Sequence, residues 1–150
     1  MKAMKVIEIE RSMRLRVDEM IGHMKLVLAG VPLGNPGDAS SRLIEAIKSA
    51  SIIAAEDSRK FQRLCQDLGI TPSARKLSFF EGNEVVRTKQ LIEELLNGND
   101  VLVVTDAGMP TVSDPGFKLV RDAIAANISI EVIPGPSAVT TALALSGLPT

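Results

Sequence analysis

From Met24 onward, short apolar runs alternate with longer segments in which apolar residues recur every three or four positions. The short runs are typical of buried strands and the longer repeat is typical of amphipathic helices. The expected strands lie at residues 25–31, 51–55, 76–80, 101–105 and 129–133, and the expected helices at 39–49, 58–68, 83–97, 114–126 and 137–146. Such alternation forms βαβ units with right-handed crossovers. The pattern therefore predicts a three-layer, doubly wound α/β fold, with five mainly parallel strands and helices on both faces.

Composition agrees with such a sheet. The chain has four Phe and no Trp or Tyr, while 45% of its residues are hydrophobic. Core volume must therefore come from Leu, Ile, Val and Ala, the residues that fill parallel sheets covered on both faces. No apolar run approaches the roughly 20 residues that a membrane-spanning helix needs, so no membrane partner is expected.

Local signals place several helix ends. Asp114 followed by Pro115 sets a capping carboxylate before a residue that has no N–H to satisfy, so a helix is expected to begin there. Asp57 and Asn83 are expected to cap the helices that follow them. Gly69 favours the end of the helix that Asp57 begins.

Charge and residue counts exclude several classes of protein. The formal net charge is −1, so any nucleic-acid surface must be a local patch or lie on another part of the protein. Cys65 is the single cysteine and cannot form an internal disulfide, which favours a reducing cytoplasm. His23 is the single histidine, so a histidine triad or a histidine-rich metal site is not expected, and no metal is predicted.

Ligands of doubly wound sheets bind beyond the carboxyl ends of the strands, so the loops there are the candidate sites. The loop after the first strand combines Gly34 and Gly37 with Pro32 and Pro36, which allows close backbone approach along a stiff path. An ordinary turn before a helix is an equal alternative. The loop is neither G-x-G-x-x-G nor a P-loop, which argues against nicotinamide cofactors and nucleoside triphosphates.

Two carboxylates follow buried strands without an obvious structural role. Glu56 directly follows the second strand and would need hydrogen-bond donors, which Arg59 could supply. For Glu56 and Arg59, a functional role and a structural role are equally compatible with the sequence. Asp106 follows the most buried strand and has no structural explanation. After the fifth strand, Ser137 could either cap the last helix or bind a ligand.

Together these loops resemble the tetrapyrrole methylase superfamily. The resemblance rests on the strings VPLGNPGD, AAEDSRK, TDAGMPTVSDPGF and IPGPSAVTTALALSGLP, which occur in the family's order and spacing. Within the superfamily they look like the branch that methylates a cytidine ribose 2′-OH of small-subunit rRNA. One departure is Glu81-Gly82, where relatives often have a histidine.

The resemblance implies a sheet in the order 3-2-4-1-5 and S-adenosyl-L-methionine as cofactor, held between this domain and a second α/β domain. It also implies a homodimer and a cytoplasmic methyltransferase. The Glu56–Arg59 string would face the substrate. The residues implied to line the cofactor site are Pro32, Leu33, Gly34, Gly108, Met109, Pro110, Val112, Ser137 and Ala138.

Methyl transfer to a hydroxyl benefits from a carboxylate that accepts its proton. We therefore expect Glu56 or Asp106 to accept the proton of, or a hydrogen bond from, the ribose hydroxyl of small-subunit rRNA. Arg59 is expected to bind an RNA phosphate. Two alternatives stay open: carbon methylation of a tetrapyrrole, and a cofactor-binding module without turnover.

The chain is expected to divide into an extension over residues 1–23 and the α/β domain over residues 24–150. The extension is either an over-extended start, with Met24 as the true first residue, or a genuine amphipathic segment. Because the family continues past the position of Thr150, we expect a fragment that lacks the second domain and is inactive alone.

Overall fold

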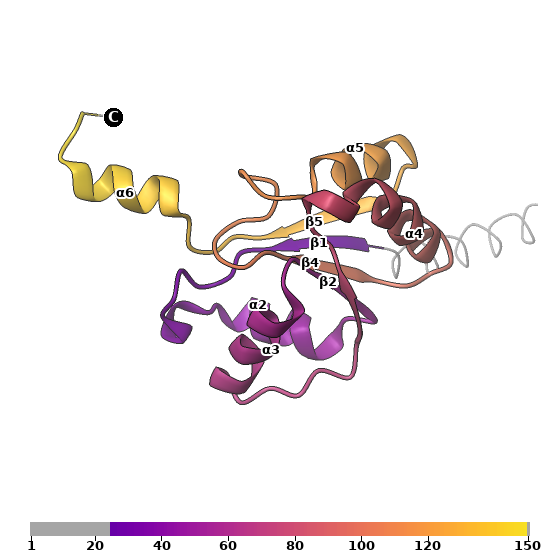
Figure 1. The fold of residues 1–150 in the computed structure, drawn as a ribbon, viewed down its shortest axis with the longest axis horizontal. Coiled ribbons are helices and arrows are strands. Elements are labelled where there is room, and N and C mark those ends of the chain that lie inside the picture. The colour runs from indigo at the N-terminus through magenta and orange to yellow at the C-terminus, as the bar shows by residue number, and fades with distance from the viewer. Residues whose placement is uncertain (1–24, 150) are drawn as a thin grey trace, which may run out of the picture.

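A computed structural model describes residues 25–149, and the expected extension over residues 1–23, with His23, lies outside them. Five strands form one sheet in the order β3-β2-β4-β1-β5 (Figure 1). The strands are β1 (Lys25–Ala29), β2 (Ile52–Ala55), β3 (Arg75–Ser78), β4 (Val101–Val104) and β5 (Ser129–Ile133). Every neighbouring pair is parallel, which confirms the predicted fold class and strand order.

Helices cover both faces of the sheet. The helices α2 (Ser41–Ser49) and α3 (Ser58–Asp67) pack on one face, and α4 (Glu84–Leu96) and α5 (Phe117–Ala125) on the other (Figure 1). Two short 3-10 helices, η1 (Pro36–Asp38) and η2 (Glu81–Asn83), precede α2 and α4. The last helix, α6 (Ala138–Ser146), projects from the body, and all of its residues are exposed (Figure 1).

The sheet separates two hydrophobic clusters. One packs β1, β2 and β4 against apolar side chains of α2 and α3, and the other packs them against α4 and α5. Aliphatic residues supply nearly all of both clusters, as composition predicts, and Phe61 and Phe79 are their two aromatic rings. All residues of β2 and β4 are buried, so the side chains that follow them emerge at the carboxyl edge of the sheet. Among the described residues, no helix is both long and apolar enough to cross a bilayer.

The start of α5 corrects one prediction. The helix begins at Phe117 rather than at Asp114, and no side chain of its own segment caps it. The acceptor comes from α4 instead: a Glu84 carboxylate oxygen accepts hydrogen bonds from the N–H groups of Gly116 (2.9 Å) and Lys118 (3.3 Å). Because another helix supplies the capping charge, the Asp114-Pro115 segment remains in the loop.

The predicted Asn83 cap is also wrong. Its side-chain oxygen accepts from the Phe80 N–H (2.9 Å), and its side-chain nitrogen donates to the Ser78 carbonyl (3.0 Å). Asn83 therefore closes the η2 turn and makes no side-chain hydrogen bond to the start of α4. By contrast, Asp57 caps α3 as predicted, accepting from the Arg59 N–H at 2.8 Å.

Substitution of Glu84 tests the capping interaction between helices. We expect Glu84→Ala to lower the free energy of unfolding by about 1 kcal/mol, because two N–H groups lose their acceptor. Glu84→Gln retains an acceptor oxygen and should lose less. Urea denaturation measures both, with the exposed Glu81→Ala as control. Equal stability of all three variants would contradict the assigned cap.

Candidate functional site

The loops after β1 and β4 are joined by a short backbone bridge. The Val31 N–H donates to the Gly108 carbonyl at 2.9 Å, and the Gly108 N–H donates to the Val31 carbonyl at 3.1 Å. Gly108 has φ = 78°, a conformation that side chains rarely adopt. A Cβ atom there would lie 3.5 Å from the Leu33 side chain and 3.6 Å from the Pro136 carbonyl. Gly108 is therefore the point where the loops after β1, β4 and β5 meet.

The loops after β1 and β5 also touch through glycine backbones. A Cβ atom on Gly30 would lie 2.6 Å from the Gly135 Cα and 2.6 Å from the Met109 sulfur. A Cβ atom on Gly135 would in turn lie 2.8 Å from the Gly30 backbone. Since real Cβ atoms do not approach backbone so closely, both positions require glycine. This contact fixes the distance between two of the predicted cofactor loops.

The residues implied to line a cofactor site gather around this junction. Pro32, Gly108 and Pro110 are buried and form the base of the loops. Leu33 and Val112 expose 37% and 52% of their surface, which leaves two apolar side chains at the rim. Met109 and Ser137 are half-buried, and Gly34 and Ala138 are exposed. Ser137 makes no side-chain capping bond to α6, so its hydroxyl is not occupied by the structural role considered for it.

The loop after β4 is held in an unusual conformation. Thr111 (φ 73°) and Ser113 (φ 63°) adopt the left-handed region, which disfavours β-branched residues such as Thr. Gly116 (φ 131°) must be glycine as well, because a Cβ there would lie 2.9 Å from the Thr111 methyl. Backbone strain of this kind, about 1–3 kcal/mol per residue, persists at ligand clamps and active sites.

Two hydrogen bonds join the Glu56-Asp57 segment to Asp106. The Asp106 N–H donates to the Glu56 carboxylate at 3.1 Å. In return the Asp57 N–H, adjacent to Glu56, donates to the Asp106 carboxylate at 3.1 Å. The second Asp106 oxygen forms an ion pair with the Lys60 ammonium at 2.6 Å. The ends of β2 and β4 thus present two oriented carboxylates, one of them paired with a cation.

Burial and neighbouring charges shift the pKa values of Glu56, Asp114 and Lys60 at this edge. Burial raises the pKa of Glu56, the Asp106 N–H lowers it in part, and the negative charges of Asp106 and Asp114 raise it further. The pKa of Asp114 is also raised, first by burial and then by the charge of Asp106. The hydrogen bond to Asp106 raises the pKa of Lys60, which keeps that ammonium charged. Glu56 and Asp114 therefore ionise less readily than ordinary carboxyl groups.

The donor expected for Glu56 is a different group. Arg59 pairs with Asp57, at 3.4 Å between its terminal nitrogen and the carboxylate, and 90% of its side chain is exposed. The backbone N–H of Asp106 occupies the place expected for Arg59, because β4 lies beside β2 in the sheet. Sequence spacing could not reveal this partner, which is 50 residues away in the chain.

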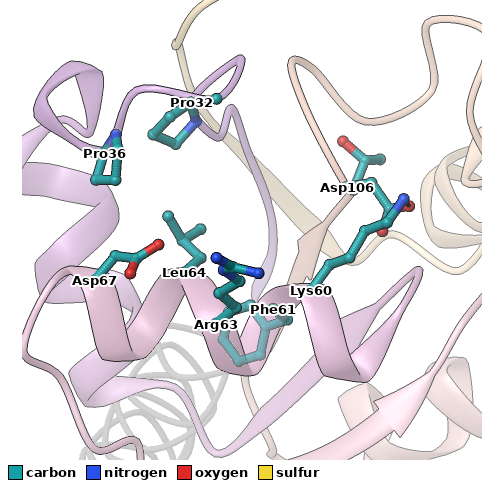
Figure 2. Close-up of a pocket in the computed structure, with 10 residues that line it drawn as sticks. Pro32, Pro36, Lys60, Phe61, Arg63, Leu64, Asp67 and Asp106 are labelled. Atoms are coloured by element: carbon teal, nitrogen blue, oxygen red, sulfur yellow. Dashed lines mark hydrogen bonds and ion pairs between the residues drawn. The ribbon is translucent and has the colours of Figure 1, made fainter.

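A cleft of about 240 Å³ opens between the first loop and α3 (Figure 2). Pro32 and Pro36 lie on one side, Leu64 and Arg63 point toward them from α3, and Lys60 extends toward Asp106 (Figure 2). Sequence analysis did not single out Arg63 or Leu64. Their signal was the i, i+3, i+4 spacing of Lys60, Arg63 and Leu64, which places all three on one side of α3. Within residues 25–149, no group of three acidic, histidine or cysteine side chains is arranged to hold a metal ion.

Converging loops at the carboxyl edge of a parallel sheet are features of a doubly wound α/β domain with a ligand crevice at that edge. Residues 25–150 match the family model described as Tetrapyrrole (Corrin/Porphyrin) Methylases. The chain belongs to the tetrapyrrole methylase family.

Two curated relatives carry the printed name Ribosomal RNA small subunit methyltransferase I. The protein of Mycobacterium tuberculosis (strain ATCC 25618 / H37Rv) is 48% identical over 125 residues, covering 83% of this chain and 44% of the relative. The protein of Micromonospora olivasterospora is 43% identical, covering 85% of this chain and 40% of the relative. The chain thus spans about half the length, or less, of these relatives.

Solved structures show the same fold at lower identity. A uroporphyrin-III-C-methyltransferase from Thermus thermophilus superposes with a TM-score of 0.62 at 21% identity, covering 84% of this chain and 53% of that one. A cobalt precorrin-4 methyltransferase superposes with a TM-score of 0.61 at 21% identity, covering 84% and 52%. These likenesses confirm the architecture.

The raised pKa of Glu56 predicts a pH-dependent stability difference. A carboxyl group whose pKa is higher in the folded state stabilises the fold at any pH below the pKa of the unfolded state. This stabilisation is lost as the pH rises through the pKa of the folded state. Glu56→Gln removes the ionisation, so the variant should gain stability relative to the parent chain as pH rises above about 4.5. Thermal unfolding between pH 4 and 7 measures the difference.

The matched control is Glu45→Gln, which changes an exposed acid on α2. Its stability difference from the parent should change less with pH. A Glu56→Gln difference that stays constant across the same range would contradict the proposed burial effect.

Proposed function

We propose that this chain is the cofactor-binding half of an S-adenosyl-L-methionine-dependent methyltransferase that modifies a cytidine ribose 2′-OH of small-subunit rRNA. One observation carries the proposal: the Glu56–Asp106 pair lies at the same sheet edge as the three loops that meet at Gly108. The names of the curated relatives support rRNA as the substrate class.

The residues around Gly108 fit a cofactor with a flat apolar part. A Cβ at Gly108 would fill the space between the first and fifth loops, and Leu33 and Val112 offer exposed apolar surface beside it. The cofactor would lie against Pro32, Leu33 and Gly34, against Gly108, Met109, Pro110 and Val112, and against Ser137 and Ala138. When bound, S-adenosyl-L-methionine supplies an electrophilic methyl group.

Glu56 is the group we assign to the attacking hydroxyl. Its raised pKa makes it a stronger base than an ordinary carboxylate, which favours proton acceptance from a hydroxyl. Asp106 fits this role less well, because Lys60 already pairs with one of its oxygens and the Asp57 N–H with the other. Asp106 orients Glu56 through its backbone N–H, and Arg59 lies at the exposed rim, where a phosphate could reach it.

The wider consequences belong to the same proposal. An rRNA substrate implies action in the cytoplasm. The exposed apolar side chains of α6, including Val139 and Leu145, support a homodimer or another protein surface that covers this helix. The alternative of tetrapyrrole carbon methylation draws support from the folds of the two solved structures and from the net charge of −1.

Methyl transfer tests the catalytic assignment. The assay follows labelled methyl incorporation from S-adenosyl-L-methionine into purified small ribosomal subunits by the gene product that contains these residues. Glu56→Gln should lower the rate about 100-fold or more, because the hydroxyl loses its proton acceptor. Asp106→Asn should have a smaller effect, since the backbone N–H that orients Glu56 is retained.

Two outcomes would contradict the proposal. Near-normal rates in both variants would remove these carboxylates from catalysis. Methylation of a porphyrinoid in place of ribosomal subunits would establish the tetrapyrrole alternative. Glu93→Gln, on α4 at the other face of the sheet, is the control for a change of charge alone.

A further inference from the structure

We infer that the cleft between the first loop and α3 binds one nucleotide of single-stranded RNA beside the methylated one, with its phosphate on Arg63. The inference rests on the proposed function and adds a binding site to it. It depends on the shape of the cleft, on the charges around it, and on its position next to the carboxylate pair.

The cleft has the shape and surface that a nucleobase requires. Pro36 forms one apolar wall, and Leu64 faces it from α3, with Phe61 beneath (Figure 2). Pro32, which the proposed cofactor site shares, lines the same side of the cleft as Pro36. Pro32 and Phe61 are buried and Leu64 is half-buried, so these surfaces are held in place by the core. A flat ring can lie between such walls, as bases that leave a stack lie against side chains in proteins that bind single-stranded RNA.

Arg63 is the cation available for a phosphate. Its side chain points from α3 into the cleft (Figure 2). On the same helix Lys60 is paired with Asp106, and Arg59 does not line the cleft and is assigned above to a different phosphate at the exposed rim. Among residues 25–149, no side chain makes an ion pair with the Arg63 guanidinium. A planar guanidinium matches a phosphate through two parallel hydrogen bonds.

The acids at the two ends of the cleft limit what binds. Asp106 and Asp67 both line it, and Lys60 already compensates the charge of Asp106. A singly charged phosphodiester can form an ion pair with Arg63. A di- or triphosphate would place further negative charge near Asp67, which is unfavourable. This charge pattern favours a nucleotide within an RNA strand over a free nucleoside triphosphate.

The cleft also lies where a neighbouring nucleotide must be. Thr105 and Asp106 form its inner end, and Asp106 is hydrogen-bonded to Glu56. A nucleotide held between Pro36 and Leu64 would therefore be separated by Asp106 from Glu56, the carboxylate assigned to the ribose hydroxyl. Binding there would hold the adjacent ribose in place, and such positioning is a large part of catalysis by proximity.

Binding measurements on the 150-residue chain test the inference. Amide chemical shifts are followed during titration with cytidine, cytidine 5′-monophosphate, the dinucleotide CpC and inorganic phosphate. We expect CpC and the monophosphate to shift residues of the cleft, with CpC bound at least as tightly. Arg63→Gln should weaken both about tenfold and leave cytidine unchanged, because it removes a charge-assisted contact to phosphate.

Arg87→Gln is the matched control, since it makes the same change of charge on α4 at the opposite face of the sheet. An equal loss of affinity in both variants would overturn the inference, because a general charge effect would then explain binding. Inorganic phosphate bound as tightly as CpC would reduce the cleft to an anion site. If S-adenosylhomocysteine displaces CpC and shifts the Arg63 amide signal itself, the cleft belongs to the cofactor site instead.

The two proposals fail separately. If the methyl-transfer assay gives the expected loss in Glu56→Gln while nucleotides do not bind at Arg63, the inference fails and the proposed function stands. If nucleotides bind at Arg63 but ribosomal subunits are never methylated, the proposed function fails, and with it the assignment of the cleft to rRNA.

Discussion

Backbone contact between loops is the constraint on which this site depends. Gly30 and Gly135 lie so close that neither position has room for a Cβ atom, and Val31 and Gly108 exchange two hydrogen bonds. These backbone contacts join the loops after β1, β4 and β5. Leu33 and Val112 remain exposed at the rim of the junction.

At the carboxyl edge of the sheet, burial and negative charge oppose the ionisation of two acids. Partly buried acids with raised pKa values make the folded state less favourable near neutral pH, and both Glu56 and Asp114 fall in this group. Away from this edge, Glu131 accepts hydrogen bonds from Lys25 and Arg42, and these contacts lower its pKa. Among the described residues, the carboxyl groups with raised pKa values thus lie at one edge of the sheet, as is common at functional sites.

The last helix extends this edge outward. α6 follows the fifth loop directly, so a surface that packs on its exposed apolar side chains would also act on Ser137 and Ala138. The two relatives named above are more than twice as long as the region they match. The site described here lies at the carboxyl edge of the sheet, and α6 follows its fifth loop.

The sequence by itself determined the architecture, because the periodicity of apolar residues reports which face of each element is buried. The five strands, the class of sheet, the Asp57 cap and the candidate loops all follow from local patterns and from the resemblance of four motifs. Tertiary structure decided the partners. Glu84 on α4 caps the start of α5. The Asp106 N–H donates to Glu56 in the place expected for Arg59. Arg63 lies on the side of α3 that lines the cleft below the first loop. These contacts join residues that are far apart in the chain. Local sequence patterns cannot identify such hydrogen-bond partners, because the fold alone brings them together.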